Sequence, residues 1–331
     1  MSALPVAIVG AGIAGLACGA ALREAGLAVE VFEKSRGLGG RIATRRVDGL
    51  AFDHGAQYAT VRGEAFPAAM QELVAAGAAA EWRPAIRDHR LDGSGDERSR
   101  HRDRWFVGTP GMSAMVRPLA DGQTVHRGRR VTGLTRRRDG WALTLDDESV
   151  TAGPYAAIAV TAPAPQALAL LEPFGAPFDR AVDAHMAPCW TVLAAFDALP
   201  VIADVIRPSR GPITWAARTS ALPDRSPRPE CWVIHGDPVW SRDHLEEERE
   251  AIADALLAAL AEASGAVAAP VYRAAHRWRH ARALEPVGEP CLLSGDGTLG
   301  AAGDWCLGAR VEAAFDSGRA LGRALAARLT P

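Results

Sequence analysis

The sequence predicts an α/β protein of two lobes, one built on a parallel sheet and the other on an antiparallel sheet. Three observations carry this prediction. The chain has 331 residues, which is more than a single hydrophobic core usually fills. Its first 33 residues alternate strand, glycine turn, helix and strand, and its final segment repeats the strand-to-helix pattern. Between them, residues 185–235 alternate apolar runs with Pro and Gly turns, which is typical of antiparallel strands.

The amino-terminal unit begins with a strand of small and β-branched residues at 6–9. A Gly-x-Gly-x-x-Gly pattern at residues 10–15 follows and opens an alanine-rich helix that ends near Gly26. A second strand covers residues 29–32 and ends at Glu33. Residues 1–33 therefore form a complete βαβ unit with an acidic residue at its end.

The middle of the chain holds several shorter elements. A glycine-rich segment at 37–41 leads into extended chain through residue 52. Residues 83–104 contain seven arginines and five carboxylates with little periodicity, which predicts a solvated hairpin or loop. We then expect a short helix at 112–119, a hairpin at 129–145 that turns at Asp139 and Gly140, and a strand at 155–160.

The second lobe follows the antiparallel run at 185–235. Residues 241–264 form the strongest amphipathic pattern in the chain, so we expect one helix there. The last segment predicts a strand near 299–302, then Gly303 and Asp304, and a helix from about 310 to 329.

Composition excludes several classes of function. The 37 basic and 39 acidic residues leave a formal net charge of −2, which makes nucleic acid an unlikely main partner. Five cysteines without C-x-x-C spacing indicate neither a disulfide framework nor a metal site, and they suit a reducing compartment. The uncharged stretch at 3–22 has no positive region before it and is interrupted by glycines. We therefore expect a cytoplasmic protein with no membrane partner.

The glycine pattern has a chemical reason. The pyrophosphate of a dinucleotide carries two negative charges, which backbone amides at a helix amino terminus can bind. A β-carbon at Gly10, Gly12 or Gly15 would obstruct the turn or that contact. Glu33 can accept hydrogen bonds from the two ribose hydroxyls, and its charge disfavours a 2′-phosphate on the same ribose. A close-packed glycine helix without a ligand is the competing interpretation of the motif.

The carboxyl-terminal segment decides between NAD and FAD. Asp304 follows Gly303 at a strand end and precedes a helix. A carboxylate there can bind a ribitol hydroxyl, while the positive helix end faces the flavin ring and stabilises its reduced anion. NAD has no ribitol, so the arrangement predicts FAD, and no residue spacing indicates covalent attachment. Arg41 can hold the pyrophosphate or a substrate phosphate. The competing interpretation of Asp304 is a simple helix cap.

These residues resemble a known family. The 10–15 motif with Glu33, and the run Ser-Arg-Gly-Leu-Gly-Gly-Arg at 35–41, resemble the glutathione-reductase-type Rossmann FAD-binding fold of flavin amine oxidases. Residues 52–58, 161–166, 277–279, 303–306, 310–312 and 317–318 resemble its renalase branch, in particular the bacterial renalase-like proteins. The similarity covers nearly the whole chain, and the contexts of Gln57-Tyr58 and Trp305-Cys306 point to the branch.

The complete set of candidates follows from these motifs. The cofactor-binding candidates are Gly10, Gly12, Ile13, Ala14, Gly15, Glu33, Lys34, Gly40, Arg41, Gly55, Ala56, Gln57, Val131, Gly303, Asp304, Arg310 and Val311. We expect a discontinuous FAD-binding domain of residues 1–61, 105–170 and 282–331, and a substrate domain of residues 62–104 and 171–281.

The resemblance implies an oxidase that takes hydride from the 2- or 6-dihydro isomers of NAD(P), returns NAD(P)⁺ and passes the electrons to O₂ as H₂O₂. A dihydropyridine expels hydride with its own nitrogen lone pair, so this chemistry needs a positioned donor and a dry pocket more than a general base. Many amine oxidases instead resemble one another in placing a lysine near the flavin. Here the only lysine is Lys34, beside the ribose-binding Glu33, which disfavours ordinary amine oxidation.

Two rival functions stay open. One is an amine oxidase or desaturase that acts on a larger apolar substrate. The other is a non-catalytic FAD-binding module that senses redox state.

The catalytic candidates are Gln57, Tyr58, His235, Trp278 and Trp305. Gln57 and Tyr58 can border the substrate face, although Tyr58 is also compatible with a core position. His235 resembles the renalase substrate-lobe histidine and can bind a carboxamide, or it is a satisfied core histidine. Trp278 and Trp305 can wall a flat pyridine ring or simply pack, and Trp305 is preferred because it adjoins Asp304.

Overall fold

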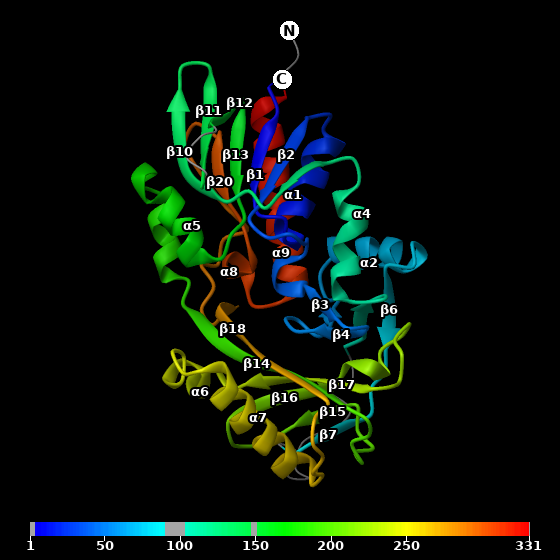
Figure 1. Cartoon of the computed structure of the whole chain (residues 1–331). Coiled ribbons are helices and arrows are strands. Elements are labelled where there is room, and N and C mark those ends of the chain that lie inside the picture. Colours follow the sequence, from blue (N-terminus) through cyan, green and yellow to red (C-terminus); the bar gives the residue numbers. More distant parts are fainter. Residues whose placement is uncertain (1–3, 90–102, 147–150, 331) are drawn as a thin grey trace.

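The protein folds into two lobes, each around its own six-stranded sheet (Figure 1). The computed structural model describes residues 4–89, 103–146 and 151–330. The upper lobe in Figure 1 carries both chain termini, and the long strands β14 (Met186–Phe196) and β18 (Tyr272–Ala283) run from it into the lower lobe.

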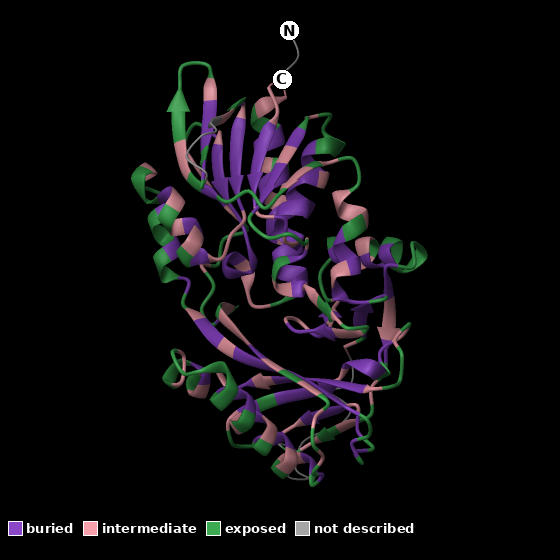
Figure 2. Ribbon diagram, in the orientation of Figure 1, coloured by how far each residue is buried: buried purple, intermediate pink, exposed green. Residues whose placement is uncertain are grey.

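The sheet of the upper lobe is parallel except at one edge. Its order is β19 (Leu292–Leu293), β20 (Leu299–Ala301), β13 (Ala157–Val160), β1 (Val6–Val9), β2 (Val29–Glu33) and β9 (Thr124–Arg127), and only β19 pairs antiparallel. Every residue of β1, β13 and β20 is buried (Figure 2), as expected for parallel strands that are covered on both faces. The sheet brings together three segments that are far apart in the sequence.

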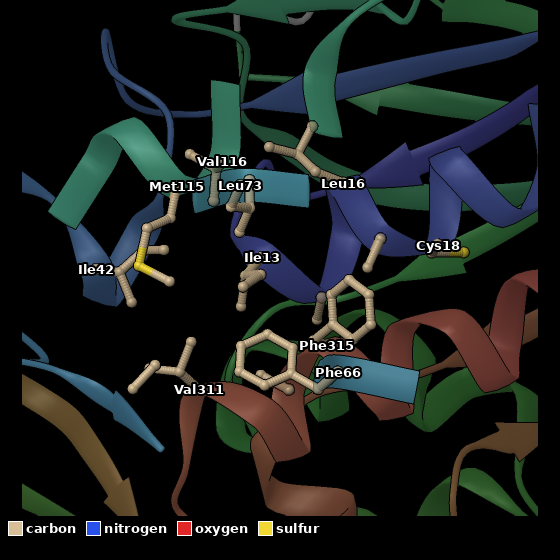
Figure 3. Close-up of a cluster of buried hydrophobic side chains, with 14 of the residues drawn as sticks. Ile13, Leu16, Cys18, Ile42, Phe66, Leu73, Met115, Val116, Val311 and Phe315 are labelled. Atoms are coloured by element: carbon tan, nitrogen blue, oxygen red, sulfur yellow. The ribbon is translucent and has the colours of Figure 1, made fainter. Parts of the chain in front are cut away.

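The first and last long helices pack against each other beside this sheet. They are α1 (Ile13–Glu24) and α9 (Val311–Leu329). Figure 3 shows Ile13 and Leu16 of α1 with Phe315 of α9 and Phe66 of α2 (Ala65–Ala75), and the rings of Phe66 and Phe315 lie 5.1 Å apart. The predicted βαβ unit, and the predicted return of the carboxyl-terminal strand and helix to it, are therefore confirmed.

Smaller elements complete the upper lobe. They are η1 (Gly40–Ile42), β3 (Thr44–Val47), β4 (Leu50–Asp53), β5 (Ala59–Thr60), β6 (Ala79–Trp82), β8 (Trp105–Gly108), η2 (Met112–Val116), α4 (Arg117–Ala120), β10 (Val131–Arg137), β11 (Gly140–Leu145), β12 (Thr151–Tyr155), α5 (Ala164–Leu171), η3 (Glu172–Phe174), η4 (Phe178–Asp183) and α8 (Asp304–Leu307). The hairpin β10–β11 confirms the prediction for 129–145. The predicted strand at 155–160 is divided, since Tyr155 ends β12 and β13 begins at Ala157.

The sheet of the lower lobe is antiparallel except at its β7 edge. Its order is β18, β14, β17 (Glu230–Gly236), β16 (Ile213–Arg218), β15 (Val205–Arg207) and β7 (Ile86–Asp88), and η5 (Thr219–Ala221) follows β16. This confirms the predicted antiparallel sheet at 185–235. The strand β18 was not predicted, because Arg and His interrupt its apolar pattern. Of the predicted polar loop at 83–104, the structure assigns 86–88 to a strand, and residues 90–102 lie outside the described residues.

The predicted single helix at 241–264 is wrong, because the chain forms two helices, α6 (Pro238–Asp243) and α7 (Arg249–Ser264). The Asp237 side chain accepts hydrogen bonds from two backbone amides and starts α6 early, and Glu248 is extended before α7 begins. Between them, Glu246 forms ion pairs with Arg277 and Arg279 of β18 at 2.8 and 2.6 Å. These ion pairs hold the turn between α6 and α7 against the sheet. Hydrophobic periodicity in the sequence does not reveal such contacts.

The five cysteines are all free thiols. Within the described part of the chain, none of the helices combines the length and apolarity that a transmembrane span requires.

Candidate active site

A cavity of about 2320 Å³ lies between the two lobes. The β1–α1 turn and the end of β2 line one part of it, and strands of the lower sheet line another. Ligand pockets of single drug-sized molecules usually occupy about 300–1,000 Å³. The cavity therefore has room for a dinucleotide and for a second ligand beside it.

The glycine turn after β1 has the form that a phosphate site needs. Gly10 has a φ of +107°, which favours glycine. A β-carbon on Gly15 would lie 2.0 Å from the Gly10 carbonyl oxygen, so this glycine allows close packing of α1 on the turn and does not itself line the cavity. A β-carbon on Gly12 would meet nothing within 4 Å and would occupy the cavity. Since no side chain caps α1, its first amides, beside the cavity-lining Ile13 and Ala14, are open to an anion.

Glu33 lies at the carboxyl end of β2, where the predicted ribose site lies. Its side chain is buried, and its two carboxylate oxygens accept hydrogen bonds from the backbone amides of Ala11 and Ser35, both at 2.8 Å. A carboxylate offers about four acceptor sites, so each oxygen can still accept a ribose hydroxyl. The neighbouring Lys34 donates to the Gln166 side chain at 3.0 Å, which holds this lysine at the same end of the cavity.

Arg41 and Asp304 join the amino- and carboxyl-terminal segments at the cavity. The Nη1 and Nη2 atoms of Arg41 donate to the two oxygens of Asp304 at 2.8 and 2.6 Å. Asp304 is 6% exposed. Gly303, not Asp304, is the N-cap of α8, and no side chain caps that helix. The simple-cap interpretation of Asp304 is therefore wrong, because its carboxylate binds Arg41.

The residues present fit FAD. The glycine turn offers amides to a pyrophosphate, Glu33 offers acceptors to a ribose, and Asp304 lies beside the amino terminus of α9 where the ribitol and flavin are expected. The other cofactor candidates that line the cavity are Gly40, Gly55, Ala56, Val131, Gly303, Arg310 and Val311. This part of the site draws on segments at 10–14, 33–56 and 303–311 and on Val131.

Four of the five catalytic candidates line the cavity. The buried Gln57 donates its side-chain amide to the Asp53 carbonyl. The Tyr58 ring stacks on Trp105 with centroids 4.1 Å apart and planes 11° apart. His235 Nε2 has no hydrogen-bond partner within the described residues. The Trp278 indole nitrogen donates to the His54 carbonyl at 2.9 Å, so Trp278 offers its ring face and not a donor.

Trp305 does not line the cavity, which corrects the expectation that it walls a flat substrate. Its side chain is fully buried in the core beside β13 and β20, and its indole nitrogen donates to the Ala162 carbonyl at 3.0 Å. Adjacency to Asp304 in the sequence misled the prediction, because the first turn of α8 directs the next side chain into the core.

A group of histidines at the cavity was not predicted from the sequence. His54 and His276 line it together with His235 and Trp278, and the rings of His54 and His276 lie 4.9 Å apart. Burial is the largest cause that lowers the pKa of each of these three histidines to about 4. All three are therefore neutral near pH 7. The sequence signal was weak, since each histidine stands alone on its own segment.

Comparison with known proteins places these features in a wider group. Residues 8–73 match the NAD(P)-binding Rossmann-like domain, and residues 71–325 match the flavin containing amine oxidoreductases. A 50-residue segment, 15% of this chain and 10% of the other protein, is 48% identical to the zeta-carotene-forming phytoene desaturase of Myxococcus xanthus.

Solved structures share the whole fold. A candidate protoporphyrinogen oxidase from Exiguobacterium sp. 255-15 has a TM-score of 0.76 at 14% identity and covers 99% of both chains. Cyclohexylamine oxidase from Brevibacterium oxydans IH-35A has a TM-score of 0.71 at 15% identity and covers 100% of both. At these identities the likeness concerns the fold alone.

Proposed function

Because the chain belongs to the flavin-containing amine oxidoreductase family, and is therefore an FAD-dependent oxidoreductase, we propose that it is a renalase-like oxidase of isomeric dihydronicotinamides. The substrates would be the 2- and 6-dihydro forms of NAD(P), and the products NAD(P)⁺ and H₂O₂. The net conversion consumes one dihydro-NAD(P), one O₂ and one proton.

The charge of the cavity is the observation that carries the proposal. Among the described residues, thirteen arginines and Lys34 line it, against the four carboxylates Glu33, Asp103, Asp121 and Asp304. None of these four stands on a strand of the lower sheet. An amine is protonated near neutral pH, and among the described residues of that sheet that line the cavity it would find no carboxylate. A dinucleotide with its phosphates fits the surplus of arginines.

The position of the single lysine supports the same proposal. Lys34 binds Gln166 beside Glu33, at the ribose end of the cavity. The chain therefore offers no second lysine for the substrate lobe, where the resemblance to amine oxidases would require one.

FAD, when bound, supplies the hydride acceptor, and its two electrons leave to O₂. The protein's own residues would bind and orient the substrate. We propose that Gly10, Gly12, Glu33, Arg41, Asp304 and the amino terminus of α9 hold the cofactor, with Gly15 supporting the turn. Tyr58 and Trp278 would border a flat ring, and neutral His235 would bind a carboxamide through its unpartnered Nε2. Gln57, tied to the Asp53 carbonyl, would shape this wall.

The expected domain division remains part of the proposal. It is supported by the strands of the parallel sheet, which come from residues 6–33, 124–160 and 292–301, and by the lower sheet, which takes β7 together with β14–β18. The elements α2, β6, η3 and η4 differ from it, because they fall within the expected substrate domain but pack in the upper lobe.

An anaerobic donor screen tests the function. The FAD-loaded protein is mixed with 2- and 6-dihydro-NAD(P), with ordinary 4-dihydro-NAD(P), and with aliphatic and aromatic amines, and flavin absorbance is followed by stopped flow. We expect rapid bleaching by the 2- or 6-dihydro isomers alone, and H₂O₂ release once O₂ is admitted. Bleaching by amines with inert dihydronicotinamides would support the amine oxidase, and bleaching by none of these donors would support a redox sensor. Either result refutes the proposal.

A further inference from the structure

One transverse row of the lower sheet crosses the cavity. In the strand register His276 pairs with Thr191, Thr191 with His235, and His235 with Trp215. Ile206 pairs with Ala216, so Arg207 comes next to Trp215. Beyond Arg207 the register continues to Asp88 of β7, which does not line the cavity. The row within the cavity therefore has five residues. Directly opposed residues on neighbouring strands project to the same side of a sheet, and all five residues line the cavity. We call this set, His276, Thr191, His235, Trp215 and Arg207, the cross-strand row.

The two ends of the cross-strand row differ in charge. Burial keeps His276 and His235 neutral near pH 7, since it is the largest cause that lowers the pKa of each to about 4. Arg207 is always charged, and its side chain is only 17% exposed. The row therefore carries its single fixed positive charge at the Arg207 end.

Arg207 is held in place by aromatic rings and has donors to spare. Its Cζ atom lies 5.0 Å from the Trp105 ring and 5.1 Å from the Trp215 ring, contacts that fix the plane of a guanidinium. Its Nη1 atom forms an ion pair with the buried Asp88 carboxylate at 3.6 Å, a distance too long for a hydrogen bond. Across the described residues the Arg207 guanidinium has this ion pair but no hydrogen bond shorter than 3.5 Å, and the buried Trp215 indole nitrogen has no hydrogen-bond partner. Two unsatisfied donors meet at one end of the row.

From this geometry we infer that Arg207 is a specificity-determining residue that binds an anionic group, a phosphate or a carboxylate, of the substrate. The substrate would lie along the cross-strand row, with its planar part over the neutral histidines and its anion at Arg207 and Trp215. A partly buried guanidinium with free N–H groups favours an anion and repels a protonated amine. This inference rests on the proposed function for the site but adds the residue that selects the substrate's charge.

The test uses ligands of equal shape and opposite charge, so that it does not depend on turnover. The FAD-loaded protein is titrated with 3-phenylpropanoate and with 3-phenylpropylamine, and binding is followed by the change in flavin absorbance. We expect the wild-type protein to bind the carboxylate more tightly. In Arg207→Gln we expect the carboxylate Kd to rise about 10- to 100-fold, the range of a hydrogen bond to a charged group, with little change for the amine.

Two further variants separate this role from other effects. Arg249→Gln removes an exposed arginine that lines the same cavity near His276, and it should leave the carboxylate preference intact. If Arg249→Gln and Arg207→Gln reduce the preference for the carboxylate equally, the preference comes from the combined charge of the cavity arginines. That result would overturn the inference. Arg207→Lys keeps the charge beside Asp88, and we expect it to fold like the wild type and to restore only part of the preference, because it lacks the planar fork.

The outcomes also separate this inference from the proposed function. If no dihydronicotinamide reduces the flavin but the carboxylate preference depends on Arg207, the function fails and the inference stands. If dihydronicotinamides reduce the flavin, and neither their KM nor the carboxylate Kd changes in Arg207→Gln, the function stands and the inference is wrong. A wild-type protein that prefers the amine also overturns the inference.

Discussion

The Arg41–Asp304 pair gives the sharpest test of the proposal that the two ends of the chain hold the cofactor. The change is Asp304→Asn, which keeps the shape of the side chain but turns one acceptor oxygen into a donor. In the native protein both Asp304 oxygens accept from Arg41, at 2.8 and 2.6 Å, and the carboxylate is 6% exposed. The variant loses one of these two bonds and places an N–H group against the guanidinium.

The size of the effect follows from that loss. A hydrogen bond to a charged group contributes about 1.5–3 kcal/mol, and about 1.4 kcal/mol corresponds to a tenfold change in an equilibrium constant. Because we expect the same carboxylate to accept a ribitol hydroxyl of FAD, the FAD Kd should rise about 10- to 100-fold. The measurement is titration of apoprotein with FAD, followed by quenching of flavin fluorescence.

A matched variant controls for the general effect of removing an acid. Glu289→Gln changes an exposed carboxylate of the same carboxyl-terminal segment, 3.4 Å from Arg180, that does not line the cavity. Its FAD Kd should equal that of the wild type. If Asp304→Asn is folded, with an unchanged circular dichroism spectrum, and binds FAD within threefold of the wild-type Kd, then Asp304 does not contact the cofactor and the reasoning fails.

Three more predictions concern stability and pH. Arg225→Met should lower the free energy of unfolding by about 3–5 kcal/mol in urea denaturation, because Asp53 is fully buried and Arg225 Nη2 binds it at 2.6 Å; a loss below about 1 kcal/mol would contradict this. Gly15→Ala should impair FAD retention after gel filtration, because its β-carbon would lie 2.0 Å from a carbonyl oxygen, and native retention would contradict it. The pKa of His276 falls from 6.5 to about 4 on folding, so the unfolded state binds more protons between these values and acid destabilises the fold. In His276→Gln the free energy of unfolding, measured in urea, should therefore decrease less between pH 6.5 and 4 than in the wild type. An equal decrease in both proteins would count against the prediction.

Much of the upper lobe could be predicted because its signals are local. The β1–α1 turn depends on glycines within six residues, and Glu33 ends the next strand. Such a pattern predicts one local structure, because strand, turn and helix follow one another directly in the chain. The prediction of a single helix at 241–264 was wrong because the break between α6 and α7 depends on distant contacts. Glu246 binds two arginines of β18 that lie about thirty residues further along the chain. The local sequence pattern at the break remains that of a helix.

The substrate half of the cavity could not be predicted in the same way. Its residues come together through strand register, and a shift of one residue reverses which side chains face the cavity. No local pattern fixes that register between β14, β16, β17 and β18. His276 stands on β18, whose Arg and His residues interrupt the apolar pattern by which a strand is predicted. Arg207 is one of 36 arginines, the 37 basic residues less the single lysine, so its position in the sequence does not distinguish it.

The two halves of the cavity differ in the kind of polar group they present, and this difference bears on the reaction. The cofactor half presents backbone amides and two buried carboxylates, Glu33 and Asp304, each already bonded within the protein and so fixed in place. The substrate half presents neutral imidazoles, aromatic faces and guanidinium groups, among them the Arg207 guanidinium beside the Trp105 and Trp215 rings. A substrate that must lose a proton before oxidation needs a base close to it, and histidines with a pKa near 4 are poor bases at pH 7. A dihydropyridine needs no base, because its own nitrogen lone pair expels the hydride, so the weak basicity of this half favours that substrate over an amine.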